Sequence, residues 1–567
     1  MKIKKTALIS LLLAMALTFT ACGSGSNNEA GTGNTGNAGH AEQGDSTEPI
    51  TVRLVAGDLN PDWDNMESDV GKFLKEKTGI TLQQEFPVGG SDTDMFALMA
   101  ASGEYPDMVM AKGSVKSLVD AGALLDLTDL IEQHAPNLKK VYGEYLNRLR
   151  YSKEDPAIYE LPSFGVGQTY FDAEGGFEIQ HQALEALGYP EIKTVKDYEN
   201  AIKAYLEQSP TTEDGQKRIG LSLNGGEWQI LISVTNPAFY ATGLPDNGEF
   251  AIDEKTFETK LHYQREEERE YFRWLNHMND IGLLDKESFV QKYDQYKAKI
   301  ATGRVIGIID QKWDYAQAEN SLKSEGKFGA TYARFPVTLD ESFQDHSYQG
   351  TGYMAGHGIA ITKSAKDPVR LIKFLDYLAS EEGQILVNWG IEGKHYEVVD
   401  GKRVFKPEIQ NLKANDGNQF KKTTGIENYL ISARYGDGVK DSTGNYYTTK
   451  FPEQFKAEYS EADKKTLAAY KVEMYKEFWP ADDAFPERPY GAAWNLNFET
   501  GSEADVIFQK TQDIMKKRVP EAILAKPENF DKVWDDFMAD LDKAGASKLN
   551  EQFTQMVKDR VDFWAQK

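Results

Sequence analysis

Aromatic and acidic side chains stand where predicted strands end, and these residue types can hold a ligand without reacting with it. Asp62 and Trp63 follow the predicted strand 49–56, and Trp313 closes the predicted strand 304–313. A flat indole ring can stack on the apolar C–H face of a sugar, while a carboxylate accepts hydrogen bonds from the sugar hydroxyls. Because ligands of open α/β sheets bind outside the strand ends, these positions predict a binding cleft.

More side chains of the same kinds occupy strand ends, turns and loops. Trp228 follows the stretch LSLNGGE, and together with Trp313 it is the first choice for ring stacking. The other candidate ligand-binding residues are Tyr105, Asp107, Asp314, Tyr353, Trp389, Glu392, His395 and Trp494. Each also has a structural interpretation, because a tryptophan can pack in a core and an acidic or histidine side chain can order a loop.

The common enzyme motifs are missing from the sequence. The eight histidines form no HExxH pair, no Cys/His cluster has zinc spacing, and there is neither a GxSxG elbow nor a Walker loop. GTGYMA (350–355) matches a dinucleotide-binding loop, but a predicted strand follows it where a helix is required. A secreted glycosidase stays an alternative, because 89 acidic residues always contain chance carboxylate pairs. We therefore expect a protein that is not an enzyme and has no catalytic metal.

The elements that must position these residues alternate between strands and helices. Residues 49–56, 80–86 and 107–111 have the β-branched, apolar composition of strands, and a helix between the first two ends at Gly79. Strand–helix–strand–helix order predicts a layered α/β lobe with a mostly parallel sheet.

The pattern resumes after about residue 165 with different partners. Thr194 and Asp197 form a predicted capping pair at the start of a helix over 194–208. Residues 359–390 read as a strand and then a helix, with Pro368 in the first turn of that helix. From about residue 404 the chain is rich in predicted helices, so the sequence predicts two α/β lobes and a helix-rich C-terminal region.

The single cysteine, Cys22, lies at the end of an export signal. Three lysines among the first five residues precede an apolar run over 7–21, which is the pattern of a signal peptide (1–21). FTAC (19–22) resembles a bacterial lipobox, and this resemblance implies lipidation of Cys22 and a membrane anchor. Residues 23–48 have almost no large apolar side chains, so we expect 22–48 to be a lipidated cysteine with a flexible tether.

Charge and hydropathy limit the classes of partner. The formal net charge is −25, and removing the signal peptide takes away three lysines and no acidic residue. Such an acidic chain repels phosphate backbones, so nucleic acid is not expected as a partner. Outside the signal peptide, no segment is apolar and long enough to span a bilayer.

Several longer stretches resemble a known family. They are SGEYPDMVM, DAGALLDLTDLI, the run from GIAITKSAKDPV to NWGIEGKHYEVVDGKR, and PENFDKVWDDFMADLDKAGASKLNEQF. They are similar to the large family 1 extracellular solute-binding lipoproteins of ABC importers, in particular to those serving oligosaccharide uptake. The resemblance extends over roughly residues 50–565 and implies a two-lobed periplasmic-binding-protein-like hinge fold (type II).

The resemblance also implies that the chain crosses between the lobes more than once. We place the crossings near Pro162, near Pro336 and near Gly383–Gly390, where proline and glycine interrupt the pattern. Lobe 1 would then comprise 49–162 and 337–385, and lobe 2 would comprise 163–336 and 386–567.

A lipid-anchored receptor on the extracytoplasmic face of the membrane is the function implied by this family. It would bind an oligosaccharide, act as a monomer and dock on the two membrane subunits of an ABC permease. A receptor for peptides or another non-sugar solute is the alternative. Relatives often carry a calcium loop, but the matching stretch 209–223 offers only Glu213 and Asp214 as carboxylates, so no cofactor is expected and calcium is a minor alternative.

Overall fold

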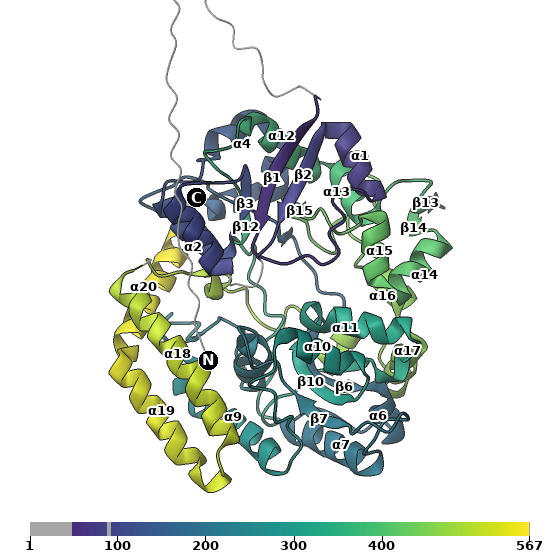
Figure 1. Cartoon of the computed structure of the whole chain (residues 1–567), viewed down its shortest axis with the longest axis vertical. Coiled ribbons are helices and arrows are strands. Elements are labelled where there is room, and N and C mark those ends of the chain that lie inside the picture. The colour runs from purple at the N-terminus through teal and green to yellow at the C-terminus, as the bar shows by residue number, and fades with distance from the viewer. Residues whose placement is uncertain (1–47, 88–91, 500, 566–567) are drawn as a thin grey trace, which may run out of the picture. The chain divides into compact units, whose positions relative to one another are not determined.

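The computed structural model describes residues 48–87, 92–499 and 501–565 (Figure 1). The predicted signal peptide, Cys22 and the tether up to residue 47 lie outside the described residues. In the described part of the chain, no helix combines the length and the hydrophobicity that crossing a bilayer requires.

The first sheet has five strands in the order β2-β1-β3-β12-β4. Their bounds are β1 Ile50–Ala56, β2 Ile80–Glu85, β3 Met108–Met110, β12 Gly358–Ile361 and β4 Leu161–Pro162. Strand β1 runs parallel to β2 and β3, which confirms the predicted parallel pairing, whereas β12 is antiparallel to both β3 and β4. The antiparallel β12 comes from much later in the chain, so the first sheet is built from distant segments.

Helices pack around this sheet. They are α1 Asp69–Thr78, α2 Asp92–Ser102, α3 Val115–Asp120, α4 Thr128–His134, α5 Pro136–Tyr142, α12 Pro368–Ala379 and α13 Glu381–Trp389. Gly79 ends α1 in the left-handed conformation with φ 67°, as the sequence predicts, and Pro368 occupies the first turn of α12. The single helix predicted within 359–390 is instead two helices, because Ser380 accepts a hydrogen bond from Gly383 N and caps α13.

The second sheet has four strands in the order β11-β6-β10-β7. Their bounds are β6 Gly175–Gln180, β7 Ile219–Ser222, β10 Val305–Gln311 and β11 Tyr332–Phe335. Strand β10 pairs with β7 in parallel and with β6 in antiparallel register. The helices of this part are α6 His181–Ala186, α7 Val195–Gln208, α8 Pro237–Ala241, α9 Glu266–Asp280, α10 Tyr293–Ala301 and α11 Lys312–Ser324.

Smaller elements and the C-terminal helices complete the fold. The two-stranded pairs are β5 Gly165–Val166 with β15 Arg434–Tyr435, β8 Phe250–Ile252 with β9 Thr259–Leu261, and β13 Tyr396–Val399 with β14 Lys402–Phe405. The helices are α14 Pro407–Asn415, α15 Gly417–Thr424, α16 Pro452–Glu458, α17 Glu461–Tyr470, α18 Glu503–Leu524, α19 Phe530–Ala544 and α20 Ala546–Trp564. The C-terminal region is therefore rich in helices, as predicted.

The buried apolar side chains form one main core beside each sheet. The first-sheet core takes side chains from β1, β2, α12 and α13 and continues through Trp389 to Ala433. The second-sheet core resumes at Leu467 and includes the C-terminal helices α18 to α20. The segment from Trp389 to Ala433 thus packs with the first sheet, and the segment from Leu467 packs with the second.

Candidate functional site

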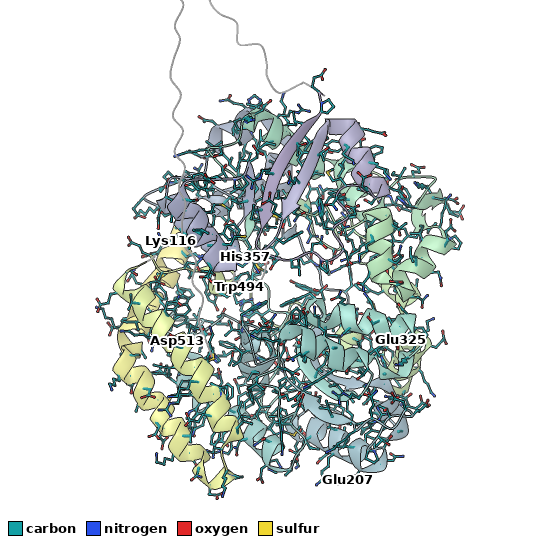
Figure 2. All side chains as sticks on the ribbon, in the orientation of Figure 1. Lys116, Glu207, Glu325, His357, Trp494 and Asp513 are labelled. Carbon is teal, nitrogen blue, oxygen red and sulfur yellow. The ribbon has the colours of Figure 1, made fainter. Side chains whose placement is uncertain are left out.

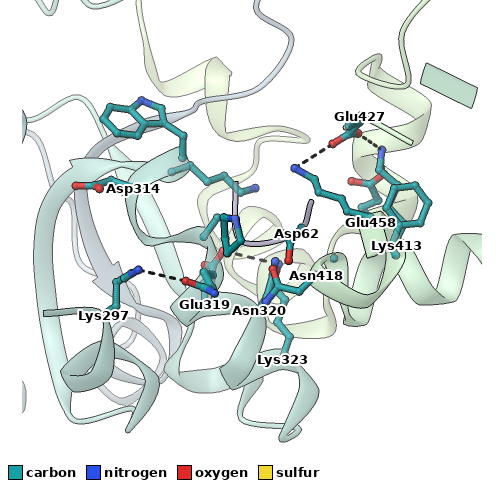
Figure 3. A pocket seen from close by; sticks show the side chains of 18 of the residues that line it. Asp62, Lys297, Asp314, Glu319, Asn320, Lys323, Lys413, Asn418, Glu427 and Glu458 are labelled. Carbon is teal, nitrogen blue, oxygen red and sulfur yellow. Dashed lines mark hydrogen bonds and ion pairs between the residues drawn. The ribbon is translucent and has the colours of Figure 1, made fainter. Parts of the chain in front are cut away.

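Two strand ends meet at one cavity of about 680 Å³ (Figure 3). The loop after β1 contributes Leu59 to Asp62, and the start of α11, directly after β10, contributes Lys312 to Asp314. The cavity is further lined by Lys297, Glu319, Asn320, Lys323, Arg334, Lys413, Asn418, Lys421, Glu427, Lys450, Glu458, Tyr459 and Asp463. Residues of both sheets thus face the same space, as the strand-end rule predicts.

Two exposed tryptophans lie with their rings parallel on the side of the second sheet. The side chains of Trp228 and Trp313 are 50% and 56% exposed. Their rings are parallel, with 6.2 Å between centroids and 6° between planes. Because large exposed apolar rings are uncommon unless they meet a partner, this pair is suited to stack on a ligand.

The loop that carries Trp228 is fixed by close packing. A Cβ on Gly226 would overlap the carbonyl oxygen of Gln291, so only glycine allows this approach. The next residue, Glu227, accepts a hydrogen bond of 2.8 Å from the backbone N–H of Tyr293 at the start of α10. The loop is therefore held on both sides, and the indole of Trp228 projects from a fixed backbone.

The first sheet contributes a cation beside the same rings. Lys112, two residues after β3, places its Nζ 5.8 Å from the centroid of the Trp228 ring. The same Nζ donates to Asp58 Oδ1 over 2.8 Å, in the loop after β1. Groups from both sheets thus meet at the tryptophan pair.

A second cavity of about 690 Å³ begins at Lys112 and is lined by the end of α20. His357 and Asn495 also line it, and the His357 ring packs edge-on against Trp494 with 4.7 Å between centroids. Burial lowers the pKa of His357 to about 4, so this imidazole is neutral at pH 7. In Figure 2 the labelled His357 and Trp494 lie close together.

Two acidic groups lie beneath Trp313. Asp310 and Asp314 are only 1% and 2% exposed, and Tyr296 donates a hydrogen bond of 2.8 Å to Asp310 Oδ2. Asn224 donates to Asp314 Oδ2 over 3.2 Å. Burial raises the pKa of both carboxyl groups. For Asp310 the nearby charge of Asp314 raises the pKa further. The same causes favour the neutral form of both carboxyl groups.

Three of the predicted site residues line the first cavity. They are Asp62, Trp313 and Asp314. Trp228 joins them through its stacking on Trp313. Trp63 does not line the cavity but packs edge-on against Tyr429, with 5.4 Å between ring centroids.

Three other predicted residues are buried, and two of them, Tyr353 and Trp389, belong to the first-sheet core. Tyr353, Trp389 and His395 are each 1% exposed. Tyr353 donates to Pro162 O over 3.1 Å, and Trp389 Nε1 donates to Tyr446 O over 3.1 Å. His395 Nδ1 accepts from Ile391 N, so its proton is on Nε2, which faces Asp69 Oδ2 at 3.0 Å. These side chains are fully used in packing, and we do not include them in the proposed site.

The remaining predicted residues have local roles or lie apart. Asp107 Oδ2 accepts a hydrogen bond of 2.8 Å from Arg53 N. Tyr105 packs against a small core formed by α2, α3 and their neighbours, and Glu392 is exposed in the loop before β13. Neither cavity is lined by any of the three.

The stretch considered for calcium is ordered by its own hydrogen bonds. Asp214 accepts from Thr212 Oγ1 and, over 2.8 Å, from Gln216 Nε2. Across the described ranges, no group of three or more His, Cys, Asp or Glu side chains is placed to hold a metal ion.

Sequence reasoning missed the cations of the cleft, although the signal was available. Lys112 lies two residues after β3 and Lys312 directly follows β10, so both stand near strand ends, as Trp313 does. A lysine usually marks a solvated surface, so its position alone did not single it out.

Comparisons with known proteins identify the family. The family model described as bacterial extracellular solute-binding protein matches residues 70–388. Lipoprotein LipO of Bacillus subtilis is 24% identical over 378 residues, which cover 64% of this chain and 70% of LipO. The fructooligosaccharide ABC transporter substrate-binding protein FusA of Streptococcus pneumoniae is 22% identical over 475 residues, which cover 79% of each chain.

Solved structures share the fold. The crystal structure of the alginate-binding protein AlgQ2 without calcium ion has a TM-score of 0.63 at 20% identity and covers 90% of this chain and 99% of its own. S. pneumoniae FusA in complex with kestose has a TM-score of 0.62 at 16% identity, with coverages of 90% and 99%. The α/β hinge-type fold expected from the sequence is thus confirmed. With the family model matching more than half of its length, this chain belongs to the bacterial extracellular solute-binding proteins.

Proposed function

We propose that this protein is the receptor of an ABC importer, and that it captures oligosaccharides in the cleft between its lobes. The observation that carries the proposal is the parallel, half-exposed pair Trp228 and Trp313 beside a cavity lined from both sheets. The names of relatives point the same way, because FusA is described as a fructooligosaccharide receptor and YtcQ of B. subtilis as a polygalacturonan/rhamnogalacturonan-binding protein.

The proposed mechanism is capture by closure. The indole rings supply apolar faces for sugar C–H groups, while Asp62 of the loop after β1 and the amide of Asn320 on α11 offer hydrogen bonds to hydroxyls. A ligand stabilises the closed arrangement only through contacts made with both lobes at once. The closed form would dock on the permease, and the protein would do no chemistry on its ligand.

The proposal includes the arrangement of the chain. Lobe 1 would contain the first sheet and the segment up to about residue 433, and lobe 2 would contain the second sheet and the C-terminal helices. Cys22, outside the described residues, would carry the lipid that holds the receptor at the extracytoplasmic face of the membrane.

A calorimetric binding screen tests the function. Neutral and acidic oligosaccharides and a peptide mixture are titrated into the tether-free protein, and the same titrations are run on Trp228→Ala. We expect at least one oligosaccharide to bind with micromolar or better affinity and the variant to lose about tenfold or more of it. Binding of peptides without any oligosaccharide, or release of reducing ends from a glycan, would overturn the proposal.

A further inference from the structure

The cavity beside Trp313 has a cation that the protein itself leaves without a partner. Lys312 is the first residue of α11, directly after β10, and it lines the cavity next to Trp313. Among the described residues, the Lys312 ammonium forms neither a hydrogen bond nor an ion pair. Its backbone N–H donates to Glu174 O over 2.6 Å, so the start of the helix is anchored while the ammonium is free.

Two further cations stand close to Lys312. Arg334 on β11 and Lys323 on α11 line the same cavity. Burial is the largest cause that lowers the pKa of Lys312 to about 8, and the positive charges of Arg334 and Lys323 contribute to the same shift. They share a single carboxylate at long range: Arg334 Nη2 and Lys323 Nζ are 3.9 and 3.8 Å from Glu319 Oε2. Glu319 and Asp172 also act on Lys312 and raise its pKa, but burial and the two cations outweigh them, so the charge of Lys312 is only partly compensated.

The other acidic groups around this site are engaged elsewhere. Asp463 is 3.2 Å from His181 Nε2 and accepts a hydrogen bond of 3.0 Å from Tyr475. Burial raises the pKa of Asp172, which accepts from two backbone N–H groups, and Glu174 Oε1 is 2.7 Å from Lys450 Nζ.

Other lysines of the same cavity show the contrast. Lys297 Nζ lies 3.1 Å from Asp294 and donates to Gln317 over 3.2 Å. Lys413 Nζ lies 3.1 Å from Glu458 Oε1. A partly buried cation without an ion-pair partner destabilises the folded state, so its presence beside an exposed indole calls for a ligand that supplies the partner. Figure 3 shows the labelled Lys297, Lys323 and Lys413 around this space.

We propose that the cavity selects an acidic oligosaccharide, whose carboxylate pairs with Lys312 while its sugar ring stacks on Trp313. This inference rests on the proposed function and names the substrate class of the same site. Lys323 and Arg334 add to the local positive potential, which offsets the repulsion of an anionic ligand by a chain of net charge −25. The ligand carboxylate therefore completes an electrostatic arrangement that the protein leaves open.

Uronic acid oligosaccharides and their methyl esters provide a matched test. Short oligogalacturonides and oligoalginates are titrated calorimetrically beside the same oligosaccharides with esterified carboxyl groups, so that only the charge differs. We expect an acid form to bind at least about tenfold more tightly than its ester, and added salt to weaken the acid form only. Sulfated neutral oligosaccharides in the same panel distinguish a carboxylate from another anion.

Two variants locate the effect. Lys312→Gln should lower the affinity for the acid form about ten- to a hundredfold and leave the ester within about twofold. The control Lys532→Gln removes the same charge on α19, where the lysine side chain is 77% exposed and pairs with Asp536, and it should change neither affinity.

The outcomes separate this inference from the proposed function. If neutral oligosaccharides bind and no acid form exceeds its ester, the acidic specificity is wrong and the receptor function stands. If the acid form is favoured equally by wild type and Lys312→Gln, Lys312 is not the determinant. If peptides bind and no oligosaccharide does, both fail.

Discussion

Some tryptophans of this molecule are exposed and others are buried, and this difference in burial distinguishes their roles. Trp228 and Trp313 are half exposed and stack on each other, whereas Trp389 is 1% exposed and packs against Phe405 and Phe451. An exposed ring contributes little to the folded state but can contribute to binding, while a buried ring contributes to stability.

We predict that Trp313→Ala lowers oligosaccharide affinity about tenfold or more while changing the free energy of unfolding by less than about 1 kcal/mol. Trp389→Ala should instead destabilise the fold by about 3–5 kcal/mol, because it leaves a cavity in the first-sheet core. Calorimetric titration and urea unfolding measure the two effects. A Trp313→Ala variant that binds as tightly as wild type would remove this ring from the site.

Lys312 gives a prediction for stability against pH without any ligand. Its pKa is about 8 in the folded state and 10.5 in the unfolded chain, so the folded state holds its proton less firmly. The buried charge therefore destabilises the protein fully below about pH 8, and this cost fades as the pH rises from 8 to 10.5. Lys312→Met should be more stable than wild type by on the order of 1–2 kcal/mol at pH 7.

Urea unfolding of both proteins at several pH values measures that difference. The gain of Lys312→Met over wild type should shrink steadily above pH 8, since the lysine then becomes neutral in the folded state. A variant that is less stable than wild type at pH 7 would show that Lys312 has a compensating partner.

The residues of the candidate site could be predicted from the sequence only where strand ends determine them. Asp62 lies in the loop after β1, Trp313 and Asp314 lie in the first turn of α11 after β10, and all three line the cavity. Tyr353 lies in a turn and Trp389 at the end of a helix, and these two aromatic side chains are buried in the core. Nothing local distinguishes the two cases, because burial there is decided by partners far away in the chain.

At the scale of elements, local signals in the sequence predict the positions of the strands well, but they do not predict where one helix ends and the next begins. The strands β1, β2, β3 and β10 lie where β-branched runs predict them. The break between α12 and α13 is not predicted, because Ser380 within an apolar helical pattern can be either a helix cap or a tolerated interior residue. The antiparallel direction of β12 could not be predicted either, because it depends on contacts between distant segments of the chain.

The capping box of α7 is one such local signal, and it gives a stability prediction. Thr194 Oγ1 accepts from Asp197 N over 3.2 Å, and Thr194 N donates to Asp197 Oδ2 over 2.9 Å. Thr194→Ala should destabilise the protein by about 1 kcal/mol, and Thr194→Ser should restore most of this. Urea unfolding measures both variants. Equal stability of Thr194→Ala and wild type would mean that helix packing alone fixes the start of α7.

At the scale of the whole molecule, several long-range connections escape any reading of the sequence. Helix α20 contributes Phe553 and Val557 to the second-sheet core, yet its last residue, Trp564, packs against the first-sheet core. There Arg148 lies 4.6 Å and Arg560 5.1 Å from the Trp564 ring centroid. A C-terminal helix that contacts both cores limits how the two parts can rotate, and no periodicity within α20 indicates this.

Ligand-driven closure is the prediction that belongs to this scale. If the ligand contacts both lobes at once, saturating oligosaccharide should lower the radius of gyration measured by small-angle X-ray scattering. It should also stabilise the protein by about 2.7 kcal/mol at a hundredfold excess over Kd, since only the folded state binds. Trp228→Ala, tested at concentrations that saturate wild type but not the variant, should show a smaller change in both quantities. Full thermal stabilisation with an unchanged radius of gyration would contradict closure, because the ligand would then bind to one lobe alone and the receptor would have no closed form to present to a permease.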